Sequence, residues 1–175
     1  MPDALLLGLL LLGAFLALVG LAAWNDARRL VIPNVIPLAL VLIWPGFAAV
    51  TGIGVWPGLA TGAAVLAIGV GLIAAGLVGG GDAKLMAACA LWAGPTLVLP
   101  FVLITLLGGG ALGVAEWVRL GRKRRLEARY GAVPASRLTS ARPGNAAVVP
   151  YAIAIAGGAL WVAVASAVAL IARTG

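Results

Sequence analysis

The chain has 175 residues, of which 63% are hydrophobic and 10% are charged, and its formal net charge is +7. A soluble domain cannot bury so large an apolar fraction, so the composition predicts an integral membrane protein. The chain has no histidine and one cysteine, Cys89, which excludes an internal disulfide, a cysteine-based zinc cluster and catalysis by histidine. Cys89 lies in an apolar run and is interpreted as a small buried hydrophobic residue.

The apolar residues occur in stretches of about 20 residues, the length of a helix that crosses the hydrocarbon core of a bilayer. In chain order we expect transmembrane helices at residues 4–24, 35–50, 57–78, 84–94, 96–118 and 147–172. The first stretch lacks a preceding basic region and a following cleavage site, which favours a retained helix over a signal peptide. We therefore expect a single all-α domain over residues 1–175, a polytopic bundle of about six transmembrane helices.

The fourth and fifth expected helices need a break between them. The stretch from Lys84 to Trp117 would extend about 50 Å as one helix, which is too long for a single crossing. Gly94–Pro95 supplies a break, because glycine is flexible and proline interrupts the helical hydrogen bonds. Gly108–Gly110 is expected to be a second flexible point.

The basic residues are distributed unevenly along the chain. Eight of the twelve lie between Arg119 and Arg142, and they define an expected basic loop at about residues 119–147. Six crossings place all basic residues except Arg173 on one side of the membrane, and the positive-inside rule makes that side the cytoplasm. Both termini are then outside. Anionic lipid headgroups, rather than nucleic acid, are the expected partners of the Arg119–Arg142 loop.

Two aspartates, Asp26 and Asp82, stand at the ends of apolar segments in a chain with five acidic residues. The expected topology puts both at the cytoplasmic boundary, where an ionisable group is costly unless it is paired, hydrated or used. Gly79–Gly81 lets the backbone turn sharply before Asp82. Two neighbouring carboxyl groups share a proton, so one can activate a water molecule while the other polarises a carbonyl group. Such a pair could hydrolyse a peptide bond without a metal or another cofactor.

Each of these residues also has a structural interpretation that the sequence leaves open. Asp82 could cap the helix that follows it, and Asp26 could form a local ion pair with Arg28 or Arg29. Lys84 could extend along the apolar surface toward the membrane interface without any chemical role. Glu116, another acid on the same expected side, has the spacing for an ion pair with Arg119.

The segments Asp26…Ile32-Pro33-Asn34 and Gly79-x-Gly81-Asp82-x-Lys84-Leu85 resemble the signatures of the type IV prepilin peptidases, membrane aspartic proteases of the G-x-G-D class. The resemblance covers nearly the whole chain, including the entry into the last helix at Val149–Ala152. It implies that Asp26 and Asp82 are the catalytic acids and that Gly79, Gly81 and Lys84 support the site.

The same resemblance implies a function and a location. The enzyme would remove a short basic leader from a prepilin or pseudopilin precursor, just before the hydrophobic helix of that precursor, at the cytoplasmic face of the bacterial inner membrane. Larger members of the family carry an added cytoplasmic domain with paired cysteines and also methylate the new N-terminus. This chain is more similar to the short, peptidase-only form of tight-adherence (Flp) pili.

Two other classes of function remain compatible with the sequence. In a small cation-coupled transporter, Asp26 and Asp82 would bind the cation at broken helices. In a non-catalytic scaffold of a pilus or secretion machine, the Arg119–Arg142 loop would be a docking surface, and loss of either aspartate would be tolerated. No pattern in the sequence singles out residues that bind a precursor or fix an oligomeric state.

Overall fold

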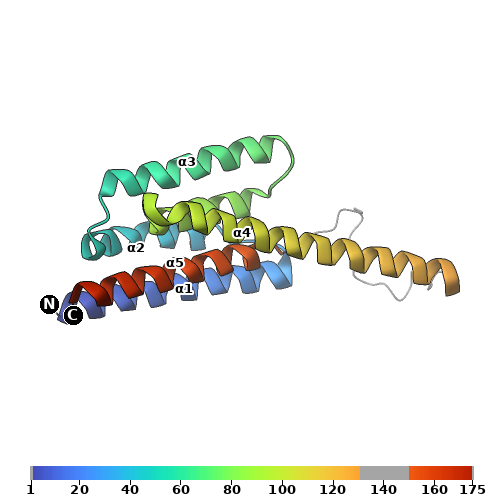
Figure 1. Ribbon diagram of the computed structural model, residues 1–175. Coiled ribbons are helices and arrows are strands. Elements are labelled where there is room, and N and C mark those ends of the chain that lie inside the picture. The colour runs from blue at the N-terminus through green and yellow to red at the C-terminus, as the bar shows by residue number, and fades with distance from the viewer. Residues whose placement is uncertain (1, 131–149, 175) are drawn as a thin grey trace.

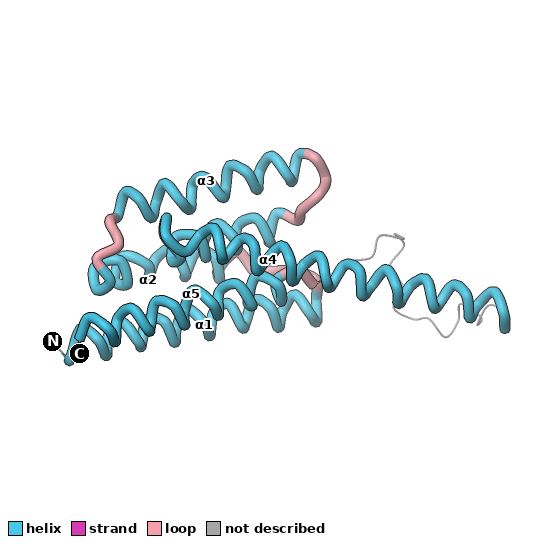
Figure 2. Tube along the Cα trace, viewed as in Figure 1, coloured by secondary structure: helices cyan, strands magenta, loops and turns pink. Residues whose placement is uncertain are grey.

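In the computed structural model the described residues, 2–130 and 150–174, form an all-helical bundle (Figure 1). Its five helices are α1 (Pro2–Arg29), α2 (Val35–Thr51), α3 (Val55–Ala74), α4 (Gly80–Tyr130) and α5 (Ala152–Thr174). The all-α class predicted from the sequence is therefore confirmed. Short loops join each of the first four helices to the next one along the chain, as Figure 2 shows.

The helix α4 contains a reversal of the chain. Gly94 lies inside it with φ of 58° and ψ of −175°, a backbone conformation outside the helical region that separates two helices. Asp82 acts electrostatically on Tyr151, and a Cβ at Gly109 would lie 2.1 Å from the ring of the same tyrosine. A straight helix would separate residues 82 and 109 by about 40 Å, so the chain must fold back at Gly94. The predicted break at Gly94–Pro95 is confirmed.

The two arms of α4 give the bundle its layers. The first helix α1 packs antiparallel to α5, because Gly8 contacts Leu170 at one end and Asp26 contacts Ala152 at the other. The second arm of α4 packs along α5, and α3 lies on the outer side of α4 (Figure 1). The 17 residues of α2 lie against α1 and α4. Six helical segments thus run through the bundle, in agreement with the expected number of about six.

An aromatic cluster forms the centre of the bundle. The Trp92 ring of α4 stacks on Phe15 of α1 and on Phe47 of α2, with ring centroids 4.7 Å apart in both pairs. Its indole N–H donates a hydrogen bond of 3.1 Å to the carbonyl oxygen of Leu40. Stacked rings with a satisfied N–H group hold three helices in one register. Cys89 is fully buried one turn away, as its apolar neighbours predicted.

The outer surface of the bundle is apolar, with exposed side chains such as Leu10, Trp56 and Leu107. Among the described helices, α1, α3, α4 and α5 are long and apolar enough to cross a membrane, and α2 is a shorter apolar helix. A soluble protein does not expose apolar side chains over so much of its surface. The chain is a multi-pass membrane protein.

Two expectations for the second arm of α4 were wrong. The helix continues through Gly108–Gly110 without a break, and a contact explains these glycines better than flexibility does, because the Tyr151 ring packs where a Cβ at Gly109 would be. The helix also continues to Tyr130, so the expected basic loop at 119–147 begins as a helix that extends beyond the bundle (Figure 1). The remainder of that loop, up to residue 149, lies outside the described residues.

Candidate functional site

The first acid of the site, Asp26, lies in the last turns of α1 and is 7% exposed. Its Oδ2 atom accepts a hydrogen bond of 3.0 Å from the backbone N–H of Ala152, the first residue of α5. The first N–H groups of a helix have no partner inside the helix, so a carboxylate there completes their hydrogen bonding. This contact fixes the orientation of the carboxyl group through its Oδ2 atom.

The second acid, Asp82, follows the glycine turn at the beginning of α4. The N–H of Ala83 bonds to the carbonyl oxygen of Gly79, which makes Gly79 the cap of the helix and places Asp82 inside the first turn. The structure thus rules out the interpretation of Asp82 as the capping residue. A Cβ at Gly81 would lie 3.2 Å from the Cβ of Ile32, so the glycine lets this turn approach the segment that follows α1.

The two aspartates meet in one cavity of about 290 Å³. The segment after α1 forms one wall, from Leu30 to Asn34, and the turn Gly79–Gly81 forms the other. The two carboxyl groups are close enough to interact electrostatically. Glycines carry no side chain, so the turn leaves room beside the acids for another backbone to approach. The structure therefore brings together four of the five site residues expected from the sequence.

The fifth expected residue, Lys84, is adjacent to this cavity but does not line it. Its Nζ atom donates a hydrogen bond of 3.0 Å to Oδ1 of Asn34. Asn34 occupies the N-cap position of α2, yet its side chain makes no cap hydrogen bond. The side chain instead ties the segment after α1 to the first turn of α4, which holds the two acidic segments together.

The alternative ion pair of Asp26 with a neighbouring arginine is not observed. Among the residues with described side chains, the one ion pair joins Arg119 to Glu116 at 3.5 Å, as the three-residue spacing predicted. The guanidinium group of Arg28 lies 3.8 Å from the centre of the Trp24 ring, away from the acid. The buried carboxyl group of Asp26 instead accepts a hydrogen bond from the backbone N–H of Ala152.

The entry to α5 supplies two contacts that sequence reasoning did not assign to the site. Tyr151 directly precedes Ala152, whose N–H bonds to Asp26. Burial raises the pKa of the Tyr151 hydroxyl group above its ordinary value, and the charge of Asp82 raises it further. The phenol therefore stays protonated near neutral pH and can donate a hydrogen bond. In the sequence, Pro150 indicates that a helix begins close after it. It does not reveal that the beginning of this helix contacts Asp26.

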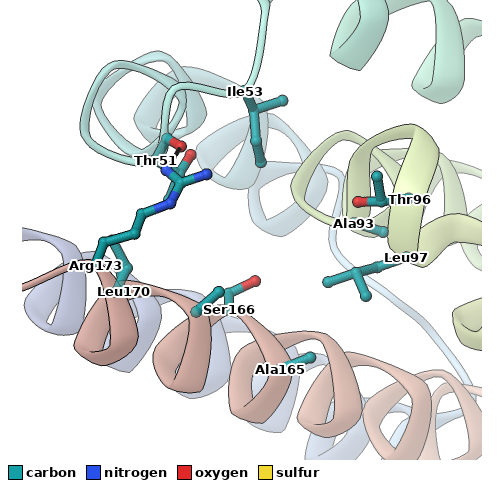
Figure 3. A pocket seen from close by; sticks show the side chains of 10 residues that line it. Thr51, Ile53, Ala93, Thr96, Leu97, Ala165, Ser166, Leu170 and Arg173 are labelled. Carbon is teal, nitrogen blue, oxygen red and sulfur yellow. Dashed lines mark hydrogen bonds between the residues drawn. The ribbon is translucent and has the colours of Figure 1, made fainter.

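A second cavity, of about 180 Å³, lies at the opposite end of the bundle (Figure 3). Arg173 of α5 closes one side of it by donating a hydrogen bond to the carbonyl oxygen of Thr51, and Ser166 and Thr96 supply hydroxyl groups. No carboxyl group lines this cavity. It therefore lacks the pair of acids that hydrolysis by an aspartic mechanism would use, and the cavity at Asp26 and Asp82 is the candidate active site.

Comparison with known proteins identifies the family of the chain. The family model of the type IV leader peptidase family matches residues 13–114, which include both aspartates, the glycine turn and both arms of α4 up to the end of the bundle. The searches of curated proteins and of solved structures yield no match. Since the matched segment makes up more than half of the chain, the chain belongs to the type IV leader peptidase family.

Proposed function

We propose that this peptidase cleaves the leader from type IV prepilin or pseudopilin precursors by an aspartic mechanism, with Asp26 and Asp82 as the catalytic pair. The observation that carries the proposal is the single cavity in which both carboxyl groups face a turn of three glycines. A chain of the leader peptidase family that places a buried and a partly buried acid at such a turn has the groups required for hydrolysis. The resemblance of the sequence to the short, peptidase-only form of tight-adherence (Flp) pili, with one cysteine and therefore no cysteine pair, supports hydrolysis without methyl transfer.

The chemistry divides between the two acids. One carboxylate removes a proton from a water molecule, and the resulting hydroxide adds to the scissile carbonyl carbon. The other carboxyl group donates its proton to the carbonyl oxygen, which stabilises the tetrahedral intermediate. When this intermediate collapses, the C–N bond breaks, the leaving amine takes a proton from the first acid, and a hydroxyl group of the intermediate returns a proton to the second acid as the carbonyl group re-forms. The two acids thus end with one proton between them, as at the start.

The charge distribution supports an active site at the cytoplasmic face of a bacterial inner membrane. Arg28, Arg29 and Lys84 lie at the end of the bundle that holds the aspartates, and α4 carries Arg119 and Arg122 beyond that end. At the opposite end, Arg173 contacts Thr51. An excess of Lys and Arg marks the cytoplasmic side of a membrane protein. The same basic residues favour anionic lipid headgroups as partners.

The test compares three aspartate substitutions in membranes that contain equal amounts of each variant. Asp26→Asn and Asp82→Asn should each abolish conversion of precursor to mature protein, because an amide keeps the size of the carboxyl group but cannot exchange its proton. The double variant should be no worse than either single variant, since the acids act as one unit. Asp3→Asn, at the exposed far end of α1, is the matched control and should cleave normally.

Near-normal conversion by either single variant would overturn the aspartic mechanism. That result would favour a non-catalytic scaffold. If the variants instead lost cation-dependent transport, it would favour a cation-coupled transporter. A chelator such as EDTA should leave conversion unchanged, because the mechanism uses no metal ion. The readout is a gel shift with sequencing of the new N-terminus, which also locates the cleaved bond.

A further inference from the structure

A large apolar groove begins next to the candidate active site and faces outward between α2 and α3. Its volume is about 610 Å³. Exposed apolar side chains from the two helices form its walls, namely Leu38, Val41, Leu59 and Leu66. Buried residues of the first arm of α4 form its floor, namely Ala87, Ala88 and Leu91. The groove exists because α3 packs on α4 and makes few contacts with α2 (Figure 1).

The groove and the catalytic cavity adjoin at Asn34. Asn34 lines both of them, and its bond to Lys84, which also lines the groove, forms the polar end of an otherwise mainly apolar surface. From Lys84 to Leu91 the floor covers two helical turns, about 10 Å of rise. A polypeptide whose scissile bond lies at Asp26 and Asp82 would therefore meet this groove within its next few residues.

The physical chemistry of the membrane restricts what that next part of the polypeptide can be. A chain that enters hydrocarbon must satisfy its backbone hydrogen bonds internally, so it is a helix, and its side chains must be apolar. One further feature of the groove suits a helix. Gly62, Ala63, Ala87 and Ala88 are small residues, which let a neighbouring helix approach closely. A lipid with its headgroup at Lys84 and its acyl chain in the groove is the competing occupant, and the cross-linking below distinguishes it from a helix.

From these observations we infer that the α2–α3 groove binds the apolar helix of the precursor directly after the scissile bond. This inference rests on the proposed function and adds the site that holds the substrate. The helix lies in the groove against α4, and its first residues reach the polar end, where the leader bends toward the two aspartates. The groove thus positions the bond at the boundary between the polar leader and the apolar helix.

Cross-linking tests this placement without requiring catalysis. Ala63→Cys and Ala64→Cys are adjacent exposed positions on α3, but only Ala63 lines the groove. Each is placed in full-length Cys89→Ala, Asp82→Asn protein and combined in membranes with a precursor that carries one cysteine in the first two turns of its apolar segment. Oxidation should join the precursor to Ala63→Cys at least about tenfold more than to Ala64→Cys, a ratio equivalent to 1.4 kcal/mol. Equal cross-linking would overturn the inference, as would Ala63→Cys joining only to a second copy of itself.

Cleavage kinetics provide the second measurement. In otherwise unchanged protein, Ala63→Trp fills the groove and should raise the KM for the precursor about tenfold or more with little change in kcat, because the indole prevents binding rather than chemistry. Ala64→Trp is the control and should leave KM within about twofold. An unchanged KM for Ala63→Trp would mean that lipid alone occupies the groove. If the starting protein cleaves but Ala63 shows no effect, the groove inference fails while the proposed function stands. If the Ala63→Cys variant cross-links to the precursor but the protein with both aspartates intact does not cleave it, the groove inference stands and the proposed function fails.

Discussion

The glycine turn at the catalytic cavity is best tested at Gly81. A Cβ there would lie 3.2 Å from the Cβ of Ile32 and 3.7 Å from its Cγ1 and Cδ1 atoms. A valine adds two more methyl groups to this contact, and overpacking of that kind costs about 1–3 kcal/mol. The simplest relief is a shift of the turn away from Ile32. That shift moves Asp82, the next residue in the chain, relative to Asp26.

A displacement of the reacting groups by about 1 Å can lower a rate about 100-fold. We therefore expect Gly81→Val to lower kcat/KM about 10- to 100-fold at equal membrane levels of the protein. Gly71→Val, at an exposed position of α3 that lines none of the described cavities, is the control, because a Cβ there meets nothing within 4 Å, and it should stay within about twofold. The assay is the initial rate of precursor conversion over a range of precursor concentrations. Similar rates for the two variants would refute the argument that the close approach of Gly81 shapes the site.

Three further predictions concern packing, the polar link and topology. Gly158→Ala should destabilise the detergent-solubilised protein by about 1–3 kcal/mol, because the new Cβ would lie 2.9 Å from the backbone oxygen of Phe101. At Gly157 a Cβ meets open space, so Gly157→Ala should be neutral or slightly stabilising. Thermal unfolding compares the two, and equal melting temperatures would contradict the packing. Lys84→Met and Asn34→Ala should each lower cleavage, and together they should lower it no further, since both remove the same hydrogen bond. Additive losses would show independent roles. In a Cys89→Ala background, a cysteine replacing the 81% exposed Trp56 should react with an impermeant thiol reagent in intact cells, and one replacing Arg122 should react only after permeabilisation. External labelling at position 122 would reverse the proposed orientation.

Local rules were sufficient for several features of this protein. The apolar stretches determined the helical class, because any segment that crosses hydrocarbon must pair its own backbone groups. The break at Gly94–Pro95 followed from the limits of proline and glycine in a helix. Asp26 and Asp82 stood out because acids are costly next to apolar segments. Each of these signals lies within a few residues of the feature that it predicts.

Local rules failed where packing outweighed intrinsic preference. A glycine in a helix costs about 1 kcal/mol relative to alanine, so Gly108–Gly110 suggested a flexible point. The helix continues through these residues, and the Tyr151 ring fills the space that a side chain at Gly109 would occupy. Similarly, the basic residues after Arg119 suggested a loop, but the helix extends to Tyr130. Charge indicates contact with water and says little about whether the backbone is helical.

The site itself depends on contacts between residues that are far apart in the chain. The bond from Ala152 to Asp26 spans 126 positions, and the bond from Lys84 to Asn34 spans 50. Neither follows from periodicity or spacing, because both depend on how α1, α4 and α5 pack. The sequence alone determined that two acids stand at membrane boundaries. The tertiary structure decided that they share one cavity, since only the reversal at Gly94 and the antiparallel packing of α1 on α5 bring the three helix ends together.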